Sequence, residues 1–157
     1  MPRKVAILVG TMTGTAELVA GEVRTALADC GHEASVTLMD DLTPTVFRED
    51  AVFLICTSTY GNGDVPDNAQ DLFAALETQR PDLSAVRYGL IALGDRTYKA
   101  TFAHGGLRFD ALLTELGATR IGEPLLHDAG SATLPEDVAA AWSITWAEEL
   151  ETVPSAA

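Results

Sequence analysis

The feature that most constrains this chain is a regular alternation of short apolar runs with longer amphipathic segments. The apolar runs have the length of β-strands and are bounded by turn residues; they cover residues 4–9, 34–39, 51–56, 88–93 and 120–126. The other segments place apolar residues at helical spacing; they cover residues 16–30, 68–79, 107–116 and 136–150. Repeated strand–helix units predict an α/β fold with an open, mostly parallel sheet and helices on both faces.

Length and composition favour one domain. The chain has 157 residues, of which 47% are hydrophobic, which is enough to bury a core. We expect a single domain over residues 1–151 and a frayed tail at 152–157. No stretch approaches the roughly 18 to 20 apolar residues that cross a bilayer, and no signal-peptide cleavage site is recognisable. Cys30 and Cys56 form neither a CxxC pair nor a ligand cluster, so we expect reduced packing residues and a cytoplasmic protein.

The net charge limits the partners. The chain carries 23 acidic and 10 basic residues, a formal charge of −13. Such a field repels nucleic-acid phosphates and anionic lipid, so neither nucleic acid nor a membrane is an expected partner, and docking to a basic protein surface is favoured. The alternative is that the acidity only confers solubility. We expect a monomer, and we interpret Asp40 and Asp41 as solvated turn residues.

Loops after the first, third and fourth expected strands are the candidates for a functional site. In doubly wound sheets, ligands bind beyond the carboxyl ends of the strands, near the point where the strand order reverses. These loops are rich in Gly, Thr or aromatic residues; they read GTMTGTAE (10–17), TSTYGNGDVPDN (57–68) and GDRTYKATFAHGG (94–106).

The first loop has the composition of a phosphate site. Hydroxyls of Thr11, Thr13 and Thr15 alternate with other residues around Gly10 and Gly14, and a helix with free first amides is expected to follow. The loop lacks the GxxxxGK[ST] lysine and the GxGxxG pattern. With no Lys or Arg inside it, it suits a terminal phosphate monoester held by neutral donors. The alternative is a Thr/Gly turn with a helix cap.

The other two loops each carry a tyrosine just past a strand end. The rings of Tyr60 and Tyr98 could face each other across a gap, with a planar heterocycle stacked between them. Gly61, Gly63 and Gly94 would let the backbone approach the edge of that ring. One tyrosine alone is more often a packing residue. Two tyrosines beside a phosphate loop favour a stacked ligand.

Other chemistries lack their residue patterns. The histidines have neither HxxxH nor triad spacing, so no metal site is expected and each is interpreted as a surface or turn residue; they are His32, His104 and His127. Cys56 lacks the arginine of a C-x5-R phosphatase loop, and Ser58 has no GxSxG elbow. Trp142 and Trp146, four residues apart, predict a helix face that packs on the sheet.

Taken together, the three loops resemble those of the flavodoxin family, and the likeness covers nearly the whole chain. TMTGT is similar to the family's (S/T)xTGxT phosphate loop. TYGNGDVPDNAQD is similar to the TYGxGDxxDNAxD loop in the FMN domains of diflavin reductases, and LGDRTYKATFAHGG to their LGxxTYxxFxxxG segment. The short length and the stretch RPDLSAVRYGLIALGDRTY resemble the short-chain, MioC-type flavodoxins. The resemblance implies a flavodoxin-like, doubly wound five-stranded parallel sheet in the order 2-1-3-4-5, with FMN as the cofactor.

The resemblance also implies which residues bind FMN. Residues 11–16 would hold the phosphate, with Ala16 standing where many flavodoxins carry a threonine. Tyr60 and Tyr98 would flank the flavin ring, and backbone groups of the second and third loops would line its edges. No catalytic residue and no metal ligand is implied. The FMN-binding set is Thr11, Met12, Thr13, Gly14, Thr15, Ala16, Thr57, Ser58, Thr59, Tyr60, Gly61, Asn62, Gly63, Leu93, Gly94, Asp95, Tyr98, Phe102 and Gly105.

The function implied by the resemblance is low-potential electron transfer. The protein would shuttle single electrons from a flavin or NAD(P)H reductase to an acceptor with a basic surface, without being an enzyme itself. Acidic side chains near the predicted site would oppose the added electrons; they are Asp64, Asp67, Asp95 and Asp128. The alternative is a flavodoxin-fold NAD(P)H-dependent quinone-type oxidoreductase, although two tyrosines over the ring would block hydride approach. A third alternative is a flavodoxin-fold module with an empty site.

Overall fold

The structure is a computed structural model that describes residues 3–11, 14–40, 42–58, 66–94, 104–128 and 133–152. Its elements follow the predicted alternation along the chain. In order they are β1 (Lys4–Gly10), α1 (Thr15–Asp29), β2 (Glu33–Leu38), η1 (Pro44–Arg48), β3 (Val52–Thr57), α2 (Asp67–Gln79), β4 (Arg87–Gly94), α3 (His104–Glu115), β5 (Thr119–Arg120), β6 (Leu125–Asp128) and α4 (Pro135–Glu151). The predicted helices and the first four predicted strands are all present, with ends shifted by a few residues.

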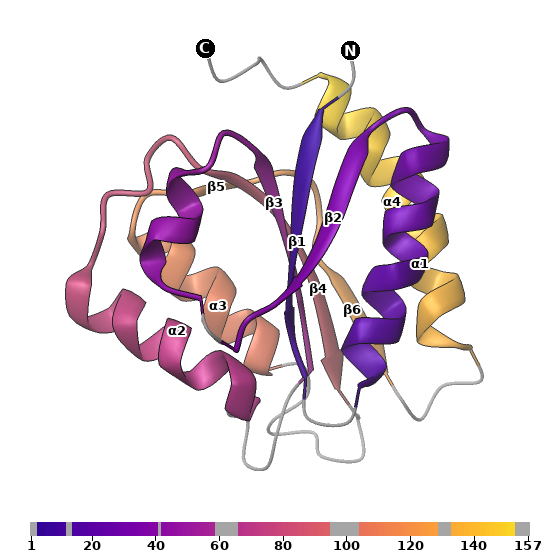
Figure 1. Cartoon of the computed structure of the whole chain (residues 1–157). Coiled ribbons are helices and arrows are strands. Elements are labelled where there is room, and N and C mark those ends of the chain that lie inside the picture. Colours follow the sequence, from indigo (N-terminus) through magenta and orange to yellow (C-terminus); the bar gives the residue numbers. More distant parts are fainter. Residues whose placement is uncertain are drawn as a thin grey trace.

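The strands form one parallel sheet. The hydrogen-bonded order is β2-β1-β3-β4-β5, and β6 also pairs with β4. Helices α1 and α4 cover one face of the sheet, and α2 and α3 cover the other (Figure 1). The predicted doubly wound fold and its strand order are therefore confirmed.

Successive strand residues contribute to two separate cores. In β1, Ala6 and Leu8 pack on the side of α2 and α3, whereas Val5 and Ile7 pack on the side of α1 and α4. Burying one such aliphatic side chain stabilises the fold by roughly 1.5 to 3 kcal/mol. Because both faces are covered by helices, the strands are apolar on both sides, which explains why they appear in the sequence as continuous apolar runs.

Two helices end in the same glycine motif. The backbone of Gly31 has φ of +90°. Its N–H donates to Ala28 O at 2.9 Å, and the N–H of His32 donates to Leu27 O at 3.0 Å. These two bonds satisfy the last carbonyls of α1 in a Schellman arrangement, which requires the left-handed conformation that glycine adopts without strain. Gly117, with φ of +105°, ends α3 in the same way.

The predicted fifth strand, residues 120–126, is broken in two. β5 pairs with the start of β4, and β6 pairs with its end. Between them, Gly122 has φ of +71°, and Pro124 has no N–H to give to a ladder. The prediction of one continuous strand is therefore wrong over residues 121–124.

The two tryptophans of α4 hydrogen-bond to this break. Trp146 Nε1 donates to Ile121 O at 3.1 Å, and Trp142 Nε1 donates to Glu123 O at 3.3 Å. The two rings are stacked with centroids 5.8 Å apart, and Trp146 is buried. The indole N–H groups satisfy carbonyls that the interrupted ladder leaves free. The predicted packing of this helix face on the sheet is confirmed.

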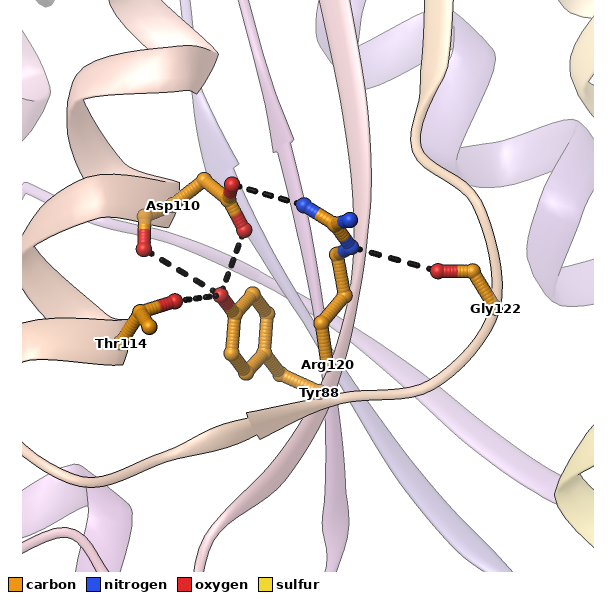
Figure 2. A network of polar contacts seen from close by, with 5 residues as sticks. All are labelled: Tyr88, Asp110, Thr114, Arg120 and Gly122. Atoms are coloured by element: carbon orange, nitrogen blue, oxygen red, sulfur yellow. Dashed lines mark hydrogen bonds and ion pairs between the residues drawn. The ribbon is translucent and has the colours of Figure 1, made fainter.

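A polar network joins β4, α3 and the fifth-strand region on the opposite face (Figure 2). The buried Tyr88 hydroxyl donates to the Asp110 carboxylate and lies 3.0 Å from Thr114 Oγ1. Arg120 donates to Asp110 Oδ2 at 2.7 Å and to Gly122 O at 3.2 Å. Burial, together with the hydrogen bond to Asp110, raises the pKa of Tyr88 well above its usual range. The phenol therefore stays protonated and holds α3 to the start of β4.

The 3₁₀ helix η1 is absent from the prediction. It begins at Pro44, whose fixed φ suits the first turn of a helix. It buries Phe47 against Phe53, with ring centroids 4.9 Å apart. Its five residues are too few to show a helical period in the sequence.

The structure buries two of the histidines for which the sequence favours surface or turn positions. His32 follows the turn at Gly31, but its ring is buried, and Nδ1 accepts a hydrogen bond from the Arg3 N–H at 3.1 Å. His127 is buried in β6, with Nε2 3.1 Å from Thr133 Oγ1. A surface position is therefore wrong for both, because each ring has a polar partner within the fold. The described residues hold no group of three His, Cys, Asp or Glu side chains placed to bind a metal ion, and no described helix could span a membrane.

Gly89 in β4 makes room for Trp146, and this generates a stability prediction. A Cβ at position 89 would lie 2.6 Å from Trp146 Nε1 and 2.9 Å from Leu54 Cδ1. Gly89→Ala is therefore expected to lower the free energy of unfolding by about 1 to 3 kcal/mol, measured by urea denaturation.

The matched control is Gly21→Ala in α1, where a Cβ meets nothing within 4 Å. There the higher helix propensity of alanine is expected to raise the free energy of unfolding by about 0.5 to 1 kcal/mol. If the two variants proved equally stable, the close packing of Gly89 on Trp146 would be contradicted.

Candidate functional site

The three predicted loops leave the same edge of the sheet. Because the strands are parallel, their carboxyl ends lie together (Figure 1). Gly10 at the end of β1 pairs with Thr57 at the end of β3. Gly94 at the end of β4 pairs with Asp128 at the end of β6. The strand order reverses between β1 and β3, so the topology places these loops where a doubly wound sheet binds a ligand.

The two described ends of the first loop are joined to each other. Gly14 has φ of +91°, a left-handed conformation that disfavours side chains. Its N–H donates to Thr11 Oγ1 at 2.9 Å. Helix α1 begins at the next residue, Thr15, and Gly14 has no side chain with which to cap it. The positive end of α1 therefore follows the loop directly, an arrangement that suits an anion.

Ala16, in the first turn of α1, faces the core. Its side chain is fully buried among the apolar residues beneath α1 and α4. The thiol of Cys56 lies 3.5 Å from Ala16 O, and burial raises the pKa of Cys56 to about 12, so the thiol stays protonated and donates to that carbonyl. Any contact of Ala16 with a phosphate would therefore come from its backbone.

The second loop begins at a tight junction between two strand ends. A Cβ at Gly10 would lie 2.6 Å from Thr57 Oγ1, so only glycine lets the two strands close up here. Thr57 is fully buried, and its hydroxyl donates to Ser58 O at 3.1 Å. The N–H of Ser58 donates to Gly10 O at 3.0 Å. Ser58, half-buried, is the first side chain of this loop that reaches the surface.

The third loop runs from the end of β4 to the start of α3. Leu93 is buried in the core and Gly94 is half-buried. Gly105 and Gly106 are buried in the first turn of α3. A Cβ at Gly106 would collide with Ala92, so the missing side chain lets the start of α3 pack directly on the end of β4.

The other predicted FMN contacts lie outside the described residues. They include both tyrosines, so the stacking of a ring between them stays a prediction. These residues are Met12, Thr13, Thr59, Tyr60, Gly61, Asn62, Gly63, Asp95, Tyr98 and Phe102, together with the acidic residues Asp41 and Asp64.

Asn68 belongs to this edge, although the sequence analysis does not single it out. Its Oδ1 accepts a hydrogen bond from the Thr11 N–H at 2.8 Å. Its Nδ2 lies 3.1 Å from Val9 O and 3.3 Å from Asp40 Oδ2. Asp40, interpreted from the sequence as a solvated turn residue, is exposed but takes part in this contact. The sequence signal for this role is an amide side chain in the first turn of the helix that follows Pro66. It lies within the TYGNGDVPDNAQD motif, which the sequence analysis interprets only through contacts with the flavin ring.

Charged side chains are arranged differently at the amino ends of the strands, the amino edge, and at their carboxyl ends, the carboxyl edge. Toward the amino edge, ion pairs among the described residues join Lys4 to Glu49, Arg80 to Glu115 and Arg120 to Asp110. Asp40, Asp67 and Asp128 lie at the carboxyl edge, at the ends of β2 and β6 and the start of α2. None of the described residues directly flanking the three loops is Lys or Arg. Described carboxylates therefore lie at the carboxyl edge, whereas Arg96 and Lys99 of the third loop lie outside the described residues.

Comparisons with known proteins show the family to which this chain belongs. A family model described as flavodoxin matches residues 7–142. Flavodoxin YqcA of Pectobacterium carotovorum subsp. carotovorum is 41% identical over 145 residues, covering 92% of this chain and 95% of its own length. Protein MioC of Escherichia coli (strain K12) is 34% identical over 150 residues, covering 94% and 98%. The solved structure of a mutant flavodoxin from Pseudomonas aeruginosa has a TM-score of 0.83 at 38% identity, covering 94% of this chain and 99% of that one.

Part of a reductase is also similar to this chain. The NADPH sulfite reductase flavoprotein alpha-component of Bacillus subtilis is 36% identical over 120 residues, which are 76% of this chain and 20% of that protein. The predicted similarities to MioC-type flavodoxins and to diflavin reductases are both confirmed. With the family model matching most of the chain, the protein belongs to the flavodoxin family and is an FMN-binding electron-transfer protein.

Proposed function

We propose that this protein carries single electrons at low potential from a reductase to an acceptor with a basic surface, without catalysing a reaction of its own. The observation that carries the proposal is the chemistry of the carboxyl edge. Neutral hydroxyl and amide donors lie in the loop proposed for the phosphate, and the carboxylates of Asp40, Asp67 and Asp128 lie at the same edge of the sheet. FMN supplies one-electron redox chemistry when bound, and the chain binds it and tunes its potential.

The described residues fit a phosphate monoester at the loop between β1 and α1. Gly14 has the left-handed backbone at the start of α1, and Thr15 is the first residue of that helix. The Thr11 hydroxyl accepts a bond from the Gly14 N–H and keeps its own proton to donate. These neutral donors suit the single phosphate of FMN. Residues 11–16 are proposed to hold it, with Tyr60 and Tyr98 flanking the ring.

The acidic carboxyl edge is proposed to lower the potential of the bound flavin. Each added electron brings negative charge into a field to which Asp40, Asp67 and Asp128 already contribute. At an effective dielectric of about 20 to 40, a unit charge about 10 Å away opposes that electron by on the order of 1 kcal/mol. Several such charges together favour a strongly reducing flavin.

The partners are proposed from similarity and charge. The likeness to a reductase flavoprotein supports a reductase as the electron donor. The net charge of −13 supports an acceptor with a basic surface, because opposite charges steer the encounter. The same charge opposes self-association, so a monomer is proposed. Both cysteines are free thiols, which fits a reducing compartment such as the cytoplasm.

The test of the carrier function is FMN binding followed by an anaerobic reductive titration. One FMN is expected to bind per chain, and two electrons are expected to enter in separate one-electron steps, the second at a much lower potential. Absorbance spectra recorded after each addition of reductant resolve the steps. A single two-electron step would instead favour an oxidoreductase acting on NAD(P)H and quinones, and a folded chain that does not bind FMN would contradict the proposal.

The charge argument predicts the effect of Asp67→Asn. Removing this exposed charge at the carboxyl edge is expected to raise the second reduction potential by roughly 10 to 40 mV at low salt, and added salt should diminish the shift. Asp50→Asn is the matched control, because Asp50 is also exposed but lies beside the amino end of β3. Spectroelectrochemical titration measures both variants. Equal shifts, or a shift indifferent to salt, would count against the charge argument.

A further inference from the structure

Asn68 joins three segments of the chain at the carboxyl edge. It is the second residue of α2, and its side chain reaches the end of β1, the loop that follows β1 and the end of β2. Oδ1 accepts from the Thr11 N–H at 2.8 Å. Nδ2 donates to Val9 O at 3.1 Å and to Asp40 Oδ2 at 3.3 Å. One half-buried amide thus has a partner on each of these segments.

The chemistry of the partners fixes the orientation of this amide. The Thr11 N–H can only donate, whereas the Val9 carbonyl and the Asp40 carboxylate oxygen accept. A flipped amide would set its oxygen against two acceptors and its NH₂ group against a donor. A single orientation therefore satisfies all three partners, and an isosteric carboxylate at position 68 could not replace it.

Thr11 is held at its backbone N–H and at its hydroxyl. Its N–H is engaged by Asn68, and its Oγ1 accepts the Gly14 N–H at 2.9 Å. The described start of the phosphate loop is therefore tied to its described end through Thr11, and to α2 and β1 through Asn68. Thr11 can still donate its hydroxyl proton to a ligand.

We propose that Asn68 is a positioning residue for the phosphate loop, which it presets for the FMN phosphate by holding Thr11 against the end of β1. The proposal rests on the proposed role of residues 11–16 in holding that phosphate. A loop ordered before binding loses less conformational entropy when the ligand arrives, so the contact raises affinity without touching the ligand. Since Asn68 lies in the first turn of the helix after the Tyr60 loop, it would link the phosphate side of the proposed site to the ring side.

The test compares FMN with riboflavin, which has the same ring and no phosphate. Asn68→Ala removes all three bonds. It is expected to weaken FMN binding at least about tenfold and riboflavin binding by less than about twofold, measured by calorimetry. Gln70→Ala is the matched control, because Gln70 is an exposed amide on the same helix that bonds to Asp67 at 3.4 Å. This control is expected to leave both affinities unchanged.

Asn68→Asp is the sharper variant. It keeps the size of the side chain and the acceptor for the Thr11 N–H, but sets a carboxylate oxygen against the Val9 carbonyl and Asp40. FMN affinity is expected to fall at least as far as in Asn68→Ala. A purely space-filling role would instead leave Asn68→Asp close to the wild type, and that result would overturn the proposal.

Amide hydrogen exchange in the flavin-free protein separates this proposal from the proposed function. Asn68→Ala is expected to speed exchange at the Thr11 and Gly14 amides at least about tenfold, while core amides such as that of Ile7 stay unchanged. If exchange at these two amides becomes faster in Asn68→Ala but the wild type does not bind FMN, the proposed function fails and the positioning contact stands. Unchanged exchange, unchanged FMN affinity or an equal loss of FMN and riboflavin binding in Asn68→Ala would overturn the positioning role.

Discussion

The hydrogen-bond register of the parallel sheet is the constraint on which the rest of the structure depends. Parallel neighbours require each connection to cross back over the sheet, so helices cover both faces and the strand interiors are apolar on both sides. The polar groups of a ligand site therefore lie at the ends of the strands. The register pairs Gly10 with Thr57 and Thr57 with Ala92, two residues before the end of β4. The carboxyl ends of the three strands therefore lie at one edge, from which the loops and helix starts extend.

Small side chains and one amide let the elements at that edge pack closely. Glycine at position 10 lets the ends of β1 and β3 close on each other, and glycine at position 106 lets α3 pack on Ala92. Asn68 then ties the start of α2 to the first loop. The network of Tyr88, Asp110 and Arg120 has a different role, since it joins α3 and β5 to the start of β4, away from the carboxyl ends of the strands (Figure 2).

Sequence patterns predict what depends on neighbours along the chain and miss what depends on distant partners. The apolar runs and the three loops are local signals, and they predict the sheet, its helices and the edge from which the three loops extend. At the break in the fifth strand, the Ile121 carbonyl is satisfied by Trp146, 25 residues further along the chain. The role of Asn68 depends on Thr11, 57 residues earlier. The burial of His32 depends on the backbone of Arg3, across the β1–α1 unit. No window of neighbouring residues contains such pairs.

The most direct test of a flavin site at the carboxyl edge is chemical-shift mapping of the ¹⁵N-labelled protein during titration with FMN. The largest shifts are expected at the amides of Gly10, Ser58 and Gly94, where the three strands end. The chemical shifts of amides at the opposite edge, such as those of Val52 and Arg87, are expected to stay unchanged. Shifts centred on the amino edge, or on the outer surfaces of α1 and α4, would contradict the assignment of the site.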